Sequence, residues 1–184
     1  MRRRDCDKEQ RLKEAVIKLI REEGFEGTSI SKITREAGVS PATVYIYYDS
    51  KEQMLESIYE EYAKRANSYM MSQIREEMEA PQIIRALLRG YYHYITENQE
   101  IFGFVEQCSH CPTLSAAEHD YCQVYDFLDR MKGRGYLRPY SNESLAAIMF
   151  YPVKAISLEA SAAGAHTEDL LEELIRIVQD ALLF

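Results

Sequence analysis

The sequence lacks the features of membrane and secreted proteins. No apolar run approaches the roughly 18 residues that a membrane-spanning helix needs, and the start, MRRRD, lacks the apolar stretch that follows in a signal peptide. Only 4 of the 184 residues are cysteines. In a chain without an export signal, these are expected to be reduced thiols and not a disulfide framework. We therefore expect a cytoplasmic protein with no membrane partner.

The motifs of common enzymes are also missing. The sequence has no Gly-rich phosphate loop, no H-E-x-x-H zinc motif and no nucleophile-elbow pattern. Of its 4 histidines, His93 and His166 stand alone. We expect no catalytic residue and no cofactor. The alternatives are a helical enzyme and a purely structural helical dimer.

Positive charge is scarce overall, with 22 Lys and Arg against 30 Asp and Glu, but it is enriched near the start. The first 52 residues carry 11 basic and 10 acidic residues, and the remainder carries 11 and 20. Arg2, Arg3 and Arg4 add a local basic arm. This balance argues against a protein that coats nucleic acid and allows one that touches DNA with a small face.

Alternating runs of Val, Ile and Thr, the pattern of strands, are absent too, and apolar residues recur at three- and four-residue spacing. In the first predicted helix, Leu12, Val16 and Leu19 share one face. The sequence predicts an all-α protein of about nine helices, one of which is the aromatic segment 101–108. The other predicted helices cover 8–23, 30–37, 41–48, 51–79, 81–98, 115–133, 142–163 and a final segment that Thr167 caps.

Two of the predicted helices are short and are separated by a turn that contains Gly38. Ser29 suits the N-cap of the first because its hydroxyl accepts from an unpaired backbone N–H, and Gly38 can end that helix at positive φ. Ser40 is the expected N-cap of the second, with Pro41 at its first helical position. This is the pattern of a helix-turn-helix, in which the second helix can lie in the major groove of DNA.

The run from Gly38 to Leu55 reads GVSPATVYIYYDSKEQML. It resembles the signature of the tetracycline-repressor (TetR) family of bacterial transcriptional regulators, and the resemblance covers about residues 8 to 60. It implies an N-terminal three-helix DNA-binding domain at 1–50 and a helical ligand-binding and dimerisation domain at 51–184. It also implies a sequence-specific regulator, most simply a repressor that a small-molecule ligand releases from a palindromic DNA operator.

The resemblance implies which residues contact the bases. Ser40, Pro41 and Thr43 would face the bases or the nearby backbone. Ser31 matches a position that contacts bases in some members of the family. The predicted helix 41–48 contains no Arg or Lys, so bidentate Arg-to-guanine readout is not expected from it.

The resemblance also implies phosphate contacts. Tyr45 and Tyr47 would bind phosphates, and the helical spacing places Tyr47 on the free side of the motif. Lys51 would contact a phosphate from the start of the next helix, whose backbone amides add an anion-binding effect. Ser29 would both cap its helix and touch phosphate. Tyr48 stands where the family more often has Phe, and we expect it to pack in the core.

The C-terminal part is rich in aromatic residues with polar tips. Such residues suit a pocket that is mostly apolar with a few orienting hydrogen bonds. A regulator of this family implies such a pocket for a small-molecule effector. We expect the effector to contact Phe104, Gln107, Cys108, Tyr125 and Tyr151.

Three cysteines and two histidines leave another mode of regulation open. Cys108 and Cys111 form a C-x-x-C pair with His110 between them, and His119 and Cys122 follow nearby. Such a set can supply soft ligands for zinc or a thiol pair for redox sensing. A second C-x-x-C at ligand spacing is missing, so we expect no metal site. A metal- or redox-responsive regulator is the alternative.

The last helix is apolar around most of its circumference, with Leu170, Leu174, Ile177 and Val178 among its residues. One side should meet the core and another a second copy of the chain. We expect a homodimer in which the last two helices of each copy form a four-helix bundle. Two recognition helices one turn of DNA apart would then read a palindromic site.

Overall fold

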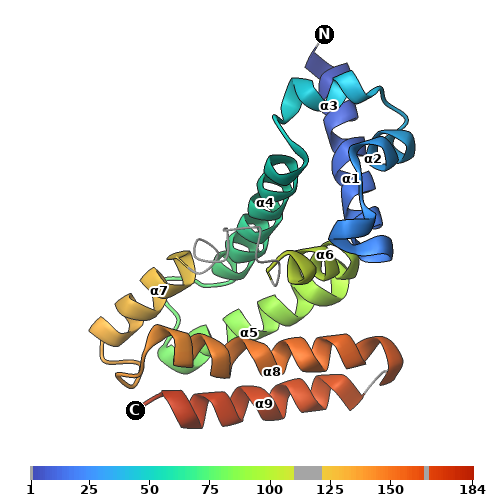
Figure 1. Ribbon diagram of the computed structural model, residues 1–184. Helices are drawn as coiled ribbons and strands as arrows, with labels where there is room; N and C mark the ends of the chain where they lie inside the picture. Colours follow the sequence, from blue (N-terminus) through green and yellow to red (C-terminus); the bar gives the residue numbers. More distant parts are fainter. Residues whose placement is uncertain (1, 110–121, 164–165) are drawn as a thin grey trace. The chain divides into compact units, whose positions relative to one another are not determined.

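The computed structural model describes residues 2–109, 122–163 and 166–184 (Figure 1). Within these ranges it contains nine α-helices and no β-strand, which confirms the all-α prediction. The helices are α1 (Arg2–Gly27), α2 (Ile30–Ala37), α3 (Pro41–Tyr47), α4 (Lys51–Ser72), α5 (Ala80–Glu97), α6 (Gln99–Ser109), α7 (Cys122–Gly133), α8 (Asn142–Ala163) and α9 (His166–Leu182). In the described part of the chain, no helix has the length and apolar character that crossing a bilayer requires.

The chain forms two compact units. The first contains the residues up to Ala63 together with α6, and the second contains residues 64–98 together with α7, α8 and α9. The division between these two units falls inside α4. Leu55 and Ile58 of α4 are buried in the same core as the apolar face of α1. The helix-turn-helix therefore needs the first half of α4 to complete its core.

Helix α1 begins at Arg2, earlier than predicted, but its regular part ends where predicted, at Gly24. Gly24 has φ of 72° and ψ of −176°, a region that glycine adopts without the steric cost of a Cβ. The Thr28 hydroxyl donates a hydrogen bond of 2.7 Å to the Gly24 carbonyl oxygen. This bond satisfies one of the carbonyls left unpaired at the helix end.

Helix α4 is shorter than the predicted helix 51–79, because it ends at Ser72. The backbone N–H of Gln73 donates to a carbonyl only three residues back, at 3.2 Å, and this tightened turn closes the helix. Helix α5 starts after Glu79, whose backbone N–H donates to the Gln82 side chain at 2.9 Å in a capping box. The predicted start of the seventh helix, residue 115, lies outside the described residues, whereas its predicted end at residue 133 is confirmed.

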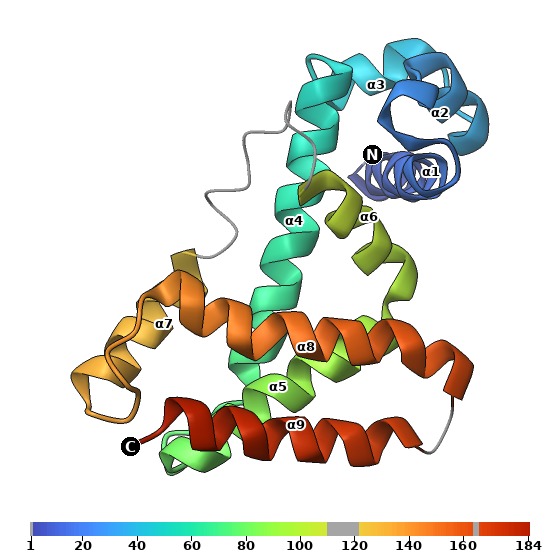
Figure 2. The same ribbon diagram turned by 60° about the horizontal axis from the view of Figure 1, so that its bottom comes forward.

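In the second unit, α5, α8 and α9 pack against one another, and α8 and α9 lie side by side (Figure 2). Charged side chains tie α5 to α9. Arg89 forms an ion pair of 3.2 Å with Glu168, and both Arg85 and Arg89 bond to Glu172. Burial opposes ionisation of Glu172, but its hydrogen bonds and ion pairs with the two arginines lower the pKa of its carboxyl below the usual value.

Tyr48 lies in the core of the first unit, as predicted, with 5% of its surface exposed. Its hydroxyl oxygen is buried and has no hydrogen-bond partner among the described residues. Burial disfavours the phenolate and raises the pKa of Tyr48 from 10.0 to about 12, with a smaller opposing effect from Lys13. A phenylalanine ring would fill the same space without an unpaired hydroxyl.

Gly38→Ala should lower the free energy of unfolding by about 1 kcal/mol, because Gly38 has a left-handed φ of 63° that a Cβ disfavours. Gly103→Ala is the matched control in the same unit, since Gly103 lies inside α6 and an added Cβ would meet only ordinary contacts. Alanine should stabilise that helix by about 0.5–1 kcal/mol. Urea denaturation followed by circular dichroism measures both values, and changes of the same sign would contradict the prediction.

Tyr48→Phe should raise the free energy of unfolding by about 1 kcal/mol, because it removes a buried hydroxyl that has no partner in the described part of the chain. It should also change the alkaline limb of the stability curve. Between pH 10.0 and about 12 the Tyr48 phenol ionises in the unfolded chain before it ionises in the folded one, so the wild type loses stability as the pH rises through this range, whereas the variant has no phenol there and does not show this loss. Urea titrations between neutral pH and pH 12 test both effects, with the exposed Tyr140→Phe as control. An unchanged or lowered stability at neutral pH would refute the assignment.

Candidate nucleic-acid interface

The turn between α2 and α3 has the geometry of a helix-turn-helix. Gly38 adopts φ of 63° and ψ of 39°, so the predicted positive φ is confirmed. The backbone N–H of Gly38 donates to Arg35 at 3.3 Å, and that of Val39 donates to Thr34 at 3.0 Å. From α1, the Arg11 guanidinium donates to the Ala37 carbonyl at 3.2 Å. These bonds satisfy the last carbonyls of α2 and fix the direction in which α3 starts.

The start of α2 presents two predicted DNA contacts, Ser29 and Ser31, which are both exposed. Ser29 is the N-cap as predicted, because its hydroxyl accepts from the backbone N–H of Lys32 at 3.3 Å. The Lys32 ammonium bonds to Glu23 and donates to the Gly27 carbonyl at 2.7 Å. The positive charge of Lys32 is therefore held against the end of α1.

Ser40 stands at the N-cap position of α3, but the predicted side-chain cap is not formed. Its hydroxyl lies 3.0 Å from the Thr43 hydroxyl instead. Thr43 is 9% exposed, so its side chain lies against the motif and not on the free side, where we expected it. Ser40 and Pro41 remain exposed, and Pro41 occupies the start of the helix as predicted.

Tyr45 and Ile46 form the outward face of α3, with 60% and 74% of their surfaces exposed. Val44 and Tyr48, four residues apart, are buried on the opposite face. Ile46 is not among the contact residues predicted from the sequence. The spacing could have indicated its exposure, because a helical residue two positions from both Val44 and Tyr48 lies on the side away from the core.

Tyr47 is half-buried and packs against the core of the first unit. Its ring centroid lies 6.3 Å from that of Tyr48, and the two rings are tilted by 52°. The packing holds the Tyr47 ring at the edge of α3. This residue therefore combines a core contact with partial exposure, and the predicted phosphate contact would have to come from its exposed edge.

The start of α4 adds a half-buried lysine and an N-cap. The Lys51 ammonium donates a hydrogen bond of 2.7 Å to the Phe25 carbonyl oxygen, which links α4 to the end of α1. Ser50 caps α4, because its hydroxyl accepts from the backbone N–H of Gln53 at 3.1 Å. A lysine ammonium has three donor hydrogens, so Lys51 can bond a phosphate while it keeps Phe25.

The five predicted effector contacts are divided between the two units. Phe104 and Cys108 are buried in the core of the first unit, and Gln107 is exposed on the same helix. Tyr125 is half-buried and Tyr151 is 59% exposed in the second unit. The cavity found in the second unit is lined by other residues. The structure therefore does not gather these five side chains in that cavity.

The cysteine and histidine set lies mostly outside the described residues. Cys108 is buried and is not in a disulfide bond within the described residues, and His110, Cys111 and His119 lie outside these residues. Cys122 begins α7, but its side chain is also outside the description. Among the side chains that are described, no group of three or more His, Cys, Asp or Glu residues could hold a metal ion.

Comparison with known proteins connects this geometry to a family. The model of the tetR family of bacterial regulatory proteins matches residues 13–58, which run from α1 through the first half of α4. The fatty acid metabolism regulator protein of Bacillus subtilis is 25% identical over 88 residues, 48% of this chain and 45% of that protein. An uncharacterised HTH-type transcriptional regulator of Haemophilus influenzae is 24% identical over 116 residues, 61% of this chain and 60% of that protein. The chain thus spans about half the length of these relatives.

Solved structures extend the likeness of the fold to the second unit. A TetR family transcription regulator from Marinobacter aquaeolei VT8 superposes with a TM-score of 0.88 over 100% of this chain and 99% of that one, at 24% identity. The fatty acid degradation regulator FadR from Bacillus halodurans superposes with a TM-score of 0.75 over 94% of each chain, at 17% identity. Residues 13–58 therefore carry the DNA-binding signature of the tetR family of bacterial regulatory proteins, and the chain as a whole has the helical fold of the solved TetR-family regulators.

Proposed function

We propose that this protein is a sequence-specific DNA-binding transcriptional regulator, a repressor that leaves a palindromic operator when a small molecule binds its second unit. The observation that carries the proposal is the exposed face of α3 in a helix-turn-helix that the family model covers. Helix α3 would enter the major groove. Its apolar tip, Ile46, would contact a thymine methyl group, since the helix offers no Arg or Lys for a guanine.

Contacts to the DNA backbone would surround this helix. Tyr45 and Tyr47 would donate their hydroxyls to phosphates, and Ser29 and Ser31 would approach from the start of α2. Lys51 would bind a phosphate together with the free backbone amides at the start of α4. These contacts carry no sequence information, so they would set the position of α3 and most of the salt dependence of binding.

Dimerisation would pair two such surfaces. On α9, apolar side chains form one stripe with a spacing of three and four residues: Leu170, Leu174, Ile177 and Ala181. Leu174 is half-buried against the core, and the other three are exposed. Ile177 is 56% exposed, and Ile148 and Tyr151 of the adjacent α8 are exposed as well. An apolar stripe of this kind on two neighbouring helices fits a second copy of itself, which forms a two-fold bundle.

Release would follow from a shift between two populations of the dimer. Helix α4 belongs to both units, beginning with Lys51 in the first and ending with Ser72 in the second. A ligand that binds one arrangement of the second unit more tightly would favour that arrangement and, through α4, a spacing of the two α3 helices that does not fit successive major grooves.

Selection of random duplex DNA on the purified protein should enrich a palindrome, because each half-site is read by one copy of α3. Lys51→Ala should then weaken binding to all sequences and reduce the slope of log affinity against log salt by about 0.9 for each phosphate that the variant no longer neutralises. Titration of the enriched site at two salt concentrations measures this slope. Failure of the folded protein to enrich any sequence, also after refolding without ligand, would overturn the proposal.

Two further variants serve as controls for this titration. Lys64→Ala removes a lysine from the same helix in the second unit and should leave both affinity and slope unchanged. Ile46→Ala should leave the slope unchanged and alter only the preference among sequences, because Ile46 carries no charge. A Lys51→Ala protein that is folded and binds with the wild-type slope would refute the phosphate contact.

Ile177→Glu should convert the dimer to a single copy at micromolar concentration, because it places a charge in the middle of the apolar stripe on α9. Arg176→Glu is the matched control, since Arg176 is exposed on the same helix and lies off the stripe. Light scattering gives the mass of each protein. A wild-type protein with the mass of one copy, or an Ile177→Glu protein with the mass of two, would contradict this interface.

A further inference from the structure

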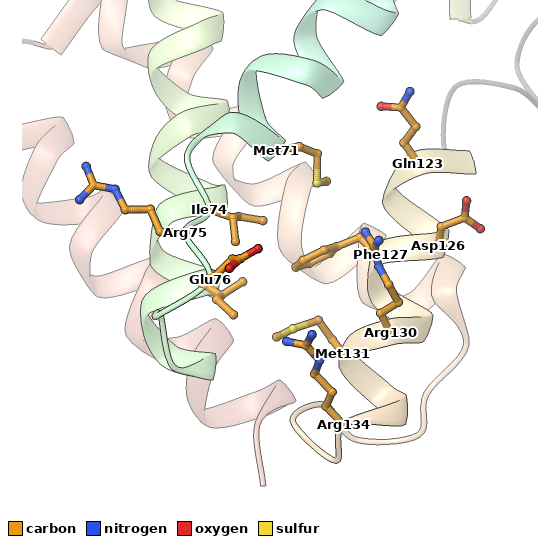
Figure 3. Close-up of a pocket in the computed structure, with 11 residues that line it drawn as sticks. Met71, Ile74, Arg75, Glu76, Gln123, Asp126, Phe127, Arg130, Met131 and Arg134 are labelled. Atoms are coloured by element: carbon orange, nitrogen blue, oxygen red, sulfur yellow. The ribbon is translucent and has the colours of Figure 1, made fainter.

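A cavity of about 650 Å³ lies in the second unit, between α7 and the segment that joins α4 to α5 (Figure 3). This volume falls in the range of sites for small molecules, about 300–1,000 Å³. Three apolar side chains that line it are almost completely buried: Ile83 of α5, and Phe127 and Met131 of α7. Met71 and Ile74 add two half-buried apolar walls. The inner part of the cavity therefore suits an apolar body.

Two guanidinium groups stand at the mouth of this cavity. Arg130 lies in the last turn of α7, and Arg134 is the first residue after this helix. The backbone N–H of Arg134 donates to the Arg130 carbonyl at 3.1 Å, so the helical spacing continues and places both arginines on the side of Phe127 and Met131. Both arginines are exposed, and neither forms an ion pair with another described residue. The other cation of this helix, Lys132, is paired with Asp129 at 2.9 Å. Like charges four residues apart on a helix repel each other, and an anion between them would remove this cost.

The remaining charges around the cavity are few. Figure 3 shows Glu76 on the wall opposite α7, with its carboxylate directed toward Phe127. Arg75, on the same segment, extends away from α7, and Asp126 points away from the apolar floor. Among the described residues that line the cavity, two guanidinium groups thus face one carboxylate. The balance favours a ligand with a single negative group, and Glu76 weakens the attraction for it.

We propose that this cavity binds the effector, and that the effector is a small amphipathic anion with an apolar body and one carboxylate or phosphate group. The apolar body would cover Phe127 and Met131, and the anionic head would accept hydrogen bonds from Arg130 and Arg134, whose planar forks match either group. The assignment rests on the proposed function. It also suggests how effector binding would be coupled to DNA binding, because Met71, a residue of α4, forms part of the cavity wall.

The test uses three probes with the same ten-carbon chain: decanoate, decyl phosphate and decanol. Calorimetric titration of the full-length protein should detect the two anions and should find decanol bound at least tenfold more weakly. Whichever anion binds more tightly identifies the head group. Arg130→Gln and Arg134→Gln should each weaken anion binding by about tenfold or more, because each removes hydrogen bonds to a charged group. Lys132→Gln, with the same loss of charge on α7 but outside the cavity, should bind as the wild type does.

Glu76→Gln is a variant that should gain affinity for the anions, and misfolding cannot produce such a gain. Removal of the one described carboxylate that faces the two arginines should tighten anion binding several-fold and leave decanol binding unchanged. The proposal would be overturned if the folded protein bound neither anion. It would also be overturned if the wild type bound the anions no differently from Arg130→Gln, Arg134→Gln and Glu76→Gln.

Titration of the enriched DNA site in parallel separates this inference from the proposed function. Decanoate or decyl phosphate should weaken DNA binding by the wild type and have at least tenfold less effect, at equal concentration, on the double variant of Arg130 and Arg134. Tight DNA binding that neither anion alters would refute the effector assignment alone. If the protein binds an anion but enriches no DNA sequence, the cavity would still be an anion-binding site, and the proposed function as a DNA-binding regulator would be refuted.

Discussion

Side chains of α1 and α4 share one core, and the helix-turn-helix depends on this contact. Three short or kinked helices bury little apolar surface by themselves, and small domains of this size are marginally stable. Met54, Leu55 and Ile58 of α4 complete the core. The Lys13 ammonium of α1 bonds to Glu61 of α4 at 2.6 Å. Burial alone would lower the pKa of Lys13, but the hydrogen bonds and charges of Glu61 and Glu9 raise this pKa above its usual value. The lysine therefore stays charged in its half-buried position.

The same core determines which side chains α3 presents. Burial of Val44 and Tyr48 turns Tyr45 and Ile46 outward, since residues on opposite faces of a helix differ by about half a turn. The hydroxyl pair of Ser40 and Thr43 keeps the start of α3 close to the motif. The outward surface is therefore aromatic and apolar at its centre, with hydroxyls and one half-buried lysine around it. Such a surface would read DNA by methyl contacts and by shape more than by bidentate hydrogen bonds.

Helix α4 joins the proposed sites. It begins beside the proposed DNA-contacting surface with Lys51 and contributes Met71 to the wall of the cavity near its end. An effector held by Arg130 and Arg134 would therefore touch the helix that the first unit uses to complete its core. The coupling would need only a difference in effector affinity between two arrangements of the second unit. In the second unit, the bonds of Arg85 and Arg89 to Glu172 hold α5 to α9, so the proposed dimer stripe and the wall formed by α5 belong to one packed body.

The sequence alone determined which segments are helical, the N-cap at Ser29, the left-handed turn at Gly38 and the signature of residues 38–55. These features depend on side chains within about four residues of one another, where periodicity and hydrogen-bonding groups can be read directly. Only the tertiary structure decided that the first unit extends to Ala63, that Thr43 turns inward and that a cavity opens beside α7. Each of these depends on side chains far apart in the chain, and the sequence pattern of a single helix does not state which of its faces a distant helix will cover.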